Sequence, residues 1–284
     1  MCLFSSRRIL ERYGMSDCKA APTPGDSRQR LTREMCPIDD LERLEMNKIP
    51  FREAVGSLMF CMLCTRPDIA YEVSRVAQFC DNPGMLHWKA LKRILRYLKG
   101  TRDTCLAYGL EINHPIEDPS DEECRTSTNS LRPFAFCDSD WAANQDHRRS
   151  TFGYLVLLNG GPVGWTSRVQ KSVATSMTEA EYVALSETAK EVSWIRRFMC
   201  DVGYTQEGPT SLMSDNQGAI CLTKNPEFHQ RTKHIDVRYH YIREEQASRR
   251  IKVEYTPTNR QPADMLTKSL TGPSLINCRR MINM

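Results

Sequence analysis

The 284-residue sequence lacks a long apolar run. A helix that spans a bilayer needs about 18 consecutive apolar residues, and the most apolar stretch, residues 55–64, is much shorter. Residues 1–12 carry a few apolar side chains and then arginines, without the apolar core of about seven residues that a signal peptide needs. We therefore expect an intracellular protein with no membrane partner.

The cysteine pattern of a disulfide scaffold or a zinc site is also missing. Twelve cysteines are present, but they are spread through apolar segments, and the one C-x-x-C, Cys61 to Cys64, has no second ligand pair near it. The formal net charge of +4 is small, so it is compatible with nucleic-acid binding without requiring it. The cysteines are therefore predicted to be reduced thiols.

What is present is the composition of a folded protein, with 40% apolar and 26% charged residues. Its length accommodates one or two domains of about 100 to 200 residues each. Residues 111–131 are almost devoid of apolar side chains and cannot bury a core, so we predict a polar linker there. The linker separates residues 1–110 from a second domain, residues 132–270, which is followed by a C-terminal tail, residues 271–284.

The first segment is predicted to be helical over residues 51–100, after an extended, proline-bearing connection at residues 15–48. Within it, apolar residues recur at three- and four-residue steps from Trp88 to Leu98, which predicts an amphipathic helix over residues 85–99. The other faces of this helix carry five cations: Lys89, Lys92, Arg93, Arg96 and Lys99. They either contact nucleic-acid phosphates, which we favour because no acidic residue interrupts them, or form a solvated surface.

The second segment alternates between strand and helix patterns. Strands are predicted at residues 134–136, 154–158, 163–166, 211–214 and 251–255. Helices are predicted at residues 178–201, near Gly218, at residues 234–247 and from about Pro262. This order indicates an α/β (α+β mixed) fold in which helices cover a mixed sheet.

Acidic residues recur where these strands end and these helices begin. Enzymes that hold two Mg²⁺ ions need several carboxylates at one point, because hard cations take oxygen ligands. Asp138 and Asp140 lie at the end of the first strand. Residues two apart in a strand share a face, so position alone leaves both open.

Helical phase separates the next pair of acids, Glu179 and Glu181. Glu181 shares a face with the apolar residue Leu185, whereas Glu179 is rotated by about 200° from Glu181. The string also contains S/T-x-x-E capping boxes, and capping by Glu179 would leave Glu181 free. We predict that Glu181 is the inward carboxylate.

Two further acids follow, Asp215 and Asp264. Asp215 ends a short strand, where ligand sites are common in α/β sheets, although a helix N-cap explains it equally well. Asp264 opens the last predicted helix, where an acid also suits the helix dipole. Each acid taken singly is weak evidence for a site.

The strings around these acids carry a specific resemblance. In order they are F-C-D-S-D-W-A, R-R-S-T-F-G-Y, T-E-A-E-Y-V-A-L, S-D-N-Q-G-A-I, R-T-K-H-I-D-V-R-Y-H and P-A-D-M-L-T-K. Together they resemble the RNase H domain of Ty1/copia-type retrotransposon Pol polyproteins. Upstream, strings such as C-T-R-P-D-I-A-Y and H-W-K-A-L-K-R-I-L-R-Y-L-K-G-T resemble the end of the reverse transcriptase in the same polyproteins. The resemblance implies an RNase H-like domain after a mainly helical thumb or connection fragment.

Carried over by position, the resemblance implies that Asp138, Glu181, Asp215 and Asp264 are the catalytic, metal-binding residues. It implies two Mg²⁺ ions, with Mn²⁺ as the alternative ion, and hydrolysis of RNA in an RNA/DNA hybrid. Gln217 matches a substrate-contacting position. A hybrid is distinguished from duplex DNA by its 2′-hydroxyls. The implied locations are the cytoplasm, a virus-like particle or the nucleus.

The sequence departs from the wider RNase H pattern, in which a mobile histidine precedes the last aspartate. Residues 255–263 contain no histidine, which puts proton shuttling or product release in doubt. His229, His234 and His240 fit no zinc spacing, so we expect them to serve the fold or contact substrate.

The Y-x-D-D hairpin of a reverse transcriptase is missing too. The resemblance therefore implies an RNase H without polymerase chemistry, with the palm and fingers of the parent polyprotein as partners. One alternative is an inactive or domesticated nucleic-acid-binding remnant. Another is a secreted effector, for which the only support is the R-x-L-R string of residues 93–96.

Overall fold

The computed structural model describes residues 2–109, 131–224 and 233–284. All but the last residue of the predicted linker, residues 111–131, lies outside this range, as does His229. The elements of the first part are α1 (Cys2–Arg12), η1 (Arg33–Met35), α2 (Asp40–Asn47), α3 (Phe51–Cys64), η2 (Pro67–Ile69), α4 (Ala70–Ala77) and α5 (Met85–Gly100). The mainly helical first segment is thus confirmed.

Helix α2 lies in the connection that was predicted to be extended, so that prediction was wrong there. The helix begins at an N-cap, where Asp39 accepts a hydrogen bond of 2.8 Å from the backbone N–H of Glu42. Leu41 and Leu44 remain 74% and 58% exposed. The helix therefore forms through local capping rather than by burying an apolar stripe, which is why periodicity failed to reveal it.

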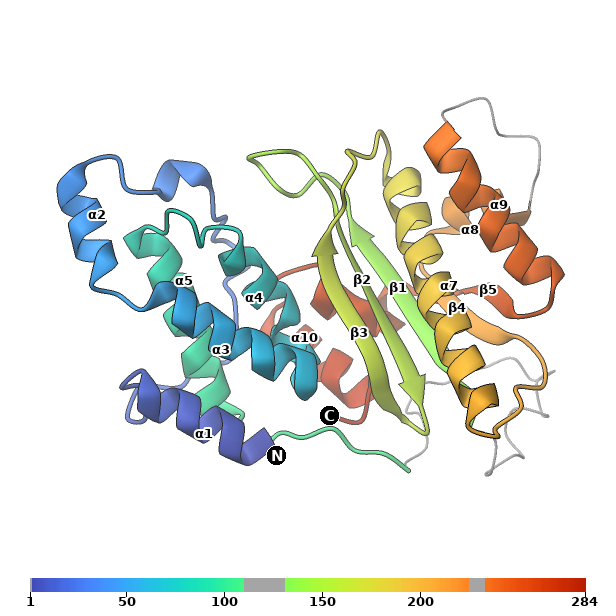
Figure 1. Ribbon diagram of the computed structural model, residues 1–284, viewed down its shortest axis with the longest axis horizontal. Coiled ribbons are helices and arrows are strands. Elements are labelled where there is room, and N and C mark those ends of the chain that lie inside the picture. Colours follow the sequence, from blue (N-terminus) through green and yellow to red (C-terminus); the bar gives the residue numbers. More distant parts are fainter. Residues whose placement is uncertain (1, 110–130, 225–232) are drawn as a thin grey trace.

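The second part contains a five-stranded mixed sheet, as predicted (Figure 1). Its strands are β1 (Phe134–Asp140), β2 (Thr151–Leu158), β3 (Gly161–Val169), β4 (Thr210–Ser214) and β5 (Ile251–Tyr255). They lie in the order β3-β2-β1-β4-β5. β1 to β3 are antiparallel neighbours, whereas β4 pairs parallel to β1 and to β5. β1 is therefore the central strand, and its end adjoins the end of β4.

Alternate residues of β1 face two different cores. Ala135 and Cys137 pack in a core with the long helix α7 (Met177–Asp201), together with residues of α8 (Gln217–Lys224) and α9 (Lys233–Ala247). Phe134 and Phe136 pack in a second core on the opposite face. The period-two pattern of a strand buried on both sides explains why the whole of β1 is apolar up to its acids.

The second core joins the sheet to the N-terminal helices. It holds residues of α1, α3, α4 and α5 along with Phe136 and Leu155 of the sheet. Hydrogen bonds cross this junction from Trp165 Nε1 to the Met62 carbonyl, at 2.7 Å, and from Ser74 Oγ to the Ser167 carbonyl, at 3.0 Å. The helical segment thus covers one face of the sheet, and the domain division at residues 111–131 stays a prediction.

The C-terminal elements lie between these two parts: η3 (Thr258–Arg260), η4 (Pro262–Leu266) and α10 (Gly272–Met281). The helix predicted from Pro262 is therefore a short 3₁₀ helix, and the side chains of Thr267 and Lys268 after it contact Asp138 of β1. The predicted tail, residues 271–284, contains α10, and its Leu275 and Ile282 belong to the shared core. None of the helices among the described residues is long and apolar enough to cross a membrane.

Candidate metal centre

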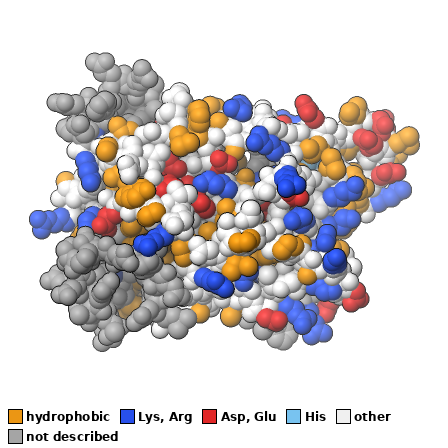
Figure 2. All heavy atoms as spheres, turned by 180° about the vertical axis from the view of Figure 1, so that it is seen from behind, with side chains coloured by type: hydrophobic (Ala, Val, Ile, Leu, Met, Phe, Trp, Pro, Cys, Tyr) orange, Lys and Arg blue, Asp and Glu red, His pale blue; other side chains and the backbone are white. Residues whose placement is uncertain are grey.

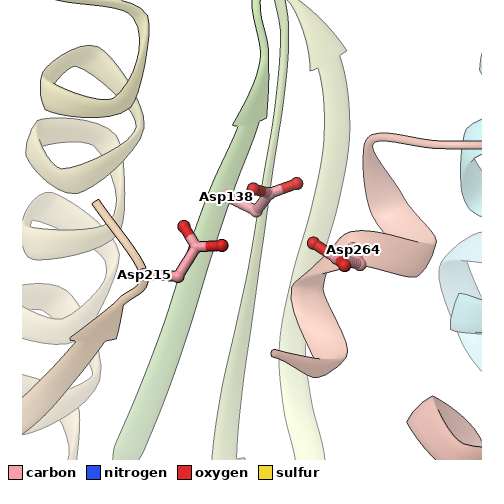
Figure 3. A group of neighbouring side chains, drawn as sticks. All are labelled: Asp138, Asp215 and Asp264. Atoms are coloured by element: carbon pink, nitrogen blue, oxygen red, sulfur yellow. The ribbon is translucent and has the colours of Figure 1, made fainter. Parts of the chain in front are cut away.

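Three aspartates meet at the edge of the sheet where β1 and β4 end. Asp138 is the fifth residue of β1, Asp215 follows β4 directly, and Asp264 lies in η4. One carboxylate oxygen from each lies within 4.8 Å of the other two (Figure 3). Parallel pairing brings the first two together, because the carboxyl ends of parallel strands meet at one edge. Three of the four acids that were predicted to bind metal therefore lie together.

Glu181, near the start of α7, lies within electrostatic reach of Asp138 and Asp215. It is 3% exposed, and its Oε1 accepts a hydrogen bond of 3.0 Å from the backbone N–H of Ser139 in β1. Its Oε2 is buried and has no hydrogen-bond partner among the described residues. A buried carboxylate oxygen without a donor is costly, and a bound cation would satisfy it.

The neighbour Glu179 serves the helix end instead. Ser176 is the N-cap of α7 and accepts from the backbone N–H of Glu179 at 3.1 Å. The Glu179 carboxylate in turn accepts from the backbone N–H of Thr175 at 2.7 Å. The helical phase argument that chose Glu181 as the inward acid is confirmed.

The structure also separates the other ambiguous acids. Asp138 is 1% exposed and lies in the cluster, whereas Asp140 is half-buried and outside it. Asp215 does not cap α8, because Asn216 Oδ1 accepts from the backbone N–H of Ala219 at 2.9 Å. The carboxylate of Asp215 is therefore left to the cluster.

Burial and the repulsion between like charges disfavour ionisation of these carboxylates. Burial raises the pKa of Glu181 well above its ordinary value, and the charges of Asp138 and Asp215 raise it further. Burial, followed by the charge of Asp138, raises the pKa of Asp264 to about 7. Three converging aspartates and the orphaned buried oxygen of Glu181 fit a hard divalent cation such as Mg²⁺.

Three further residues position the acids, and their roles were not recognised from the sequence. Thr258 Oγ1 donates to Asp215 at 2.8 Å, and Thr267 Oγ1 donates to Asp138. Lys268 Nζ lies 3.0 Å from Asp264 Oδ1 and 3.3 Å from Asp138 Oδ2. The only available signal was that Thr267 and Lys268 stand beside Asp264 in P-A-D-M-L-T-K.

The residues predicted to contact nucleic acid differ in exposure and in hydrogen bonding. Arg93 donates to the Gly25 carbonyl at 2.9 Å, and Arg96 donates to the Lys19 carbonyl at 2.7 Å, so both hold the loop that crosses α5. Lys89 and Gln217 are exposed, while Lys92 and Lys99 are partly buried. Lys and Arg side chains are scattered over the helical half of the molecule among apolar and acidic ones (Figure 2). Nucleic-acid binding by these residues stays a prediction.

The histidines and the R-x-L-R string do not form a site in the described residues. His240 is exposed, and the side chain of His234 lies outside the described part. Ile94 and Leu95 of the string are 1% and 0% exposed inside α5. The string is therefore part of the helical core.

The strand order and the position of the acids define the class of protein: an RNase H-like fold with an acidic cluster at the end of its central strand. The chain is 43% identical over 277 residues to the retrovirus-related Pol polyprotein from transposon TNT 1-94 of Nicotiana tabacum, covering 98% of this chain and 19% of that protein. It belongs to the family of Ty1/copia-type retrotransposon Pol polyproteins, and it spans about a fifth of the length of such relatives.

Two other comparisons are more limited. The chain is 43% identical over 150 residues to secreted RxLR effector protein 161 of Plasmopara viticola, covering 53% of this chain and 94% of that one. A solved structure of LC11-RNase H1 in complex with RNA/DNA hybrid aligns with a TM-score of 0.35 and 12% identity, covering 48% of this chain and 94% of that one. No family model matches the chain.

Proposed function

We propose that this protein is a Mg²⁺-dependent RNase H that hydrolyses the RNA strand of an RNA/DNA hybrid. The observation that carries the proposal is the meeting of Asp138, Asp215 and Asp264, within electrostatic reach of Glu181, whose Oε2 is buried and lacks a donor among the described residues. Membership of the Ty1/copia Pol family supports the same activity.

The four carboxylates would hold two divalent ions, Mg²⁺ or Mn²⁺. When bound, such a pair lowers the pKa of a water molecule and stabilises the attacking and leaving oxygens of the phosphodiester. The chain contributes the fixed geometry: Thr258 and Thr267 orient Asp215 and Asp138, and the backbone N–H of Ser139 orients Glu181. The exposed Gln217, two residues after Asp215, would contact the RNA strand.

The test compares wild type with Asp215→Asn on a labelled RNA/DNA hybrid, with duplex DNA as the control substrate. We expect Mg²⁺-dependent cleavage of the RNA strand by wild type, none in EDTA, and none by Asp215→Asn. Asparagine preserves shape but is a poorer ligand for a hard dication, so the variant should fold normally. Equal activity in the two proteins, or none in a folded wild type, would contradict the proposal.

A second candidate is an inactive, nucleic-acid-binding descendant of the same domain. It is favoured by the ammonium of Lys268, which already neutralises part of the cluster. This candidate predicts hybrid binding that is unchanged by EDTA and by Asp215→Asn, without cleavage. In either case the remaining segments of a longer Pol polyprotein, including a polymerase palm and fingers, are the proposed protein partners.

A further inference from the structure

A lysine ammonium lies inside the acidic cluster. Lys268 follows η4, and its backbone N–H donates to the Asp264 carbonyl at 2.9 Å, which fixes the turn that carries it. Its Nζ lies 3.0 Å from Asp264 Oδ1, and 3.3 and 3.4 Å from the two carboxylate oxygens of Asp138. One cation therefore bridges two of the four acids that would hold metal.

This ammonium has two effects on the acidic cluster. It offsets the repulsion between carboxylates that are only a few ångströms apart. It also occupies oxygen lone pairs that a divalent ion would need, because Asp138 and Asp264 belong to the set that offers ligand atoms. The Thr267 hydroxyl holds Asp138 from the adjacent position, so the acid stays oriented when the ammonium leaves.

The side chain of Lys268 is able to move away from the two acids. Its side chain is 35% exposed, against 2% for Asp138 and 13% for Asp264, so water already reaches the ammonium on its flexible four-carbon stem. Asp140 is a half-buried carboxylate outside the cluster and within electrostatic reach of Lys268. A displaced ammonium would thus keep both solvent and a counter-charge.

We propose that Lys268 is a built-in cation of the acidic cluster, which holds Asp138 and Asp264 together in the empty site and must release them before a divalent ion binds. The lysine thereby weakens the affinity for metal and makes the site easier to empty. This inference rests on the proposed metal site, but it does not require that the site cleave RNA.

The experiment titrates the full chain with Mg²⁺ by calorimetry, in wild type and in Lys268→Met. Methionine keeps much of the length and volume of the side chain without its charge. We expect Lys268→Met to bind Mg²⁺ about tenfold more tightly, because a competing charge at this distance shifts an ionic equilibrium by about one power of ten or more. Lys268→Arg, which keeps the charge, should bind much as wild type does.

The matched control is Lys252→Met. Lys252 forms a surface ion pair with Glu254, at 2.7 Å, on β5, and its loss should leave Mg²⁺ affinity unchanged. Equal or weaker Mg²⁺ binding by Lys268→Met would overturn the role of Lys268 while leaving the metal site intact. If neither wild type nor Lys268→Met binds Mg²⁺ or Mn²⁺, the proposed function and this inference fall together.

A second measurement needs no substitution and so does not depend on how a variant folds. Wild type is treated with an acetylating reagent for amines, with and without Mg²⁺, and modification of each lysine is measured by mass spectrometry. Release of the ammonium predicts several-fold more modification of Lys268 in Mg²⁺, with Lys252 unchanged. Equal or reduced modification of Lys268 under saturating Mg²⁺ would overturn the inference.

Discussion

Two groups of buried charged side chains in this molecule are built in opposite ways. In the helical half, Arg66 and Asp68 are fully buried, and the guanidinium donates two hydrogen bonds to the carboxylate, at 2.9 and 2.8 Å. The hydroxyl of Tyr97 adds a third bond to Asp68, at 2.6 Å. In the acidic cluster the carboxylates outnumber the cations, and an oxygen of Glu181 has no donor among the described residues.

The pKa values express this difference. Burial alone would raise the pKa of Asp68, but the Arg66 guanidinium outweighs burial and holds it below its ordinary value. In the cluster, burial and like charges act together and raise the pKa of Glu181 and of Asp264. A buried charge that is fully paired contributes to the fold, whereas a buried carboxylate without enough positive counter-charge favours the binding of a cation.

The largest expected effect is on catalysis, at the under-compensated group. Asp138→Asn should reduce RNA cleavage by at least about a thousandfold, equivalent to about 4 kcal/mol of transition-state stabilisation, because it removes a charged metal ligand. Asp140→Asn, two residues further along β1, is the matched control and should retain activity within about tenfold. A larger loss in Asp140→Asn than in Asp138→Asn would reverse the assignment of the two acids.

The next largest effect is on stability, at the paired group. Asp68→Asn should lower the free energy of unfolding by about 3 kcal/mol, because it leaves the Arg66 guanidinium buried without its counter-charge. Urea unfolding of the metal-free protein measures this loss. Asp26→Asn provides the control, since its pair with Arg93 is 3.9 Å long and half-exposed, so less than about 1 kcal/mol is expected. Equal losses of unfolding free energy in the two variants would mean that the buried pair stabilises the fold no more than the exposed pair does.

A smaller effect is expected on the pH dependence of stability. The pKa of Asp264 is raised to about 7, so between its ordinary value and about 7 the folded protein binds more protons at this group than the unfolded chain does. Stability from this group is therefore lost as pH rises through that range. In EDTA, the melting temperature of wild type relative to Asp264→Asn should fall between about pH 5 and about pH 8.

Saturating Mg²⁺ should remove this pH dependence at neutral pH, because metal binding favours the ionised carboxylates. Thermal unfolding in EDTA and in Mg²⁺, with both proteins at several pH values, makes the comparison. A wild-type curve parallel to that of Asp264→Asn in EDTA would show that the cluster is not under-compensated.

The smallest effect concerns charges on the surface of the helical half. Lys89 is exposed, and Lys89→Gln should lower the salt dependence of hybrid binding by about one unit if its ammonium contacts a phosphate. Arg93 is committed to the Gly25 carbonyl, so Arg93→Gln should instead cost about 1 kcal/mol of stability with little change in that slope. Filter binding over a range of KCl concentrations, beside thermal unfolding, distinguishes these roles. If instead Arg93→Gln lowered the salt dependence and Lys89→Gln lowered the stability, Arg93 would be the phosphate contact and Lys89 the structural residue.

Much of this molecule followed from the sequence by itself. Strand and helix periods predicted the mixed sheet and the long helix α7 within a few residues, because apolar spacing directly reflects burial. Helical phase selected Glu181 over Glu179, and motif resemblance selected the three aspartates that the structure brings together. Local capping in α2 escaped prediction, since it leaves no apolar period, and the helix predicted from Pro262 is only the short η4.

Only the tertiary structure decided how the acids are paired and neutralised. Asp138, and not Asp140, lies in the cluster and contacts Thr267 and Lys268 after η4. The cap at Asn216 leaves Asp215 to the cluster. The helices of residues 1–100 cover the sheet through a shared core that no periodicity specifies. Lys268 became part of the site only when the turn after η4 placed its ammonium between Asp138 and Asp264, because electrostatic contacts depend on distance in space rather than separation along the chain.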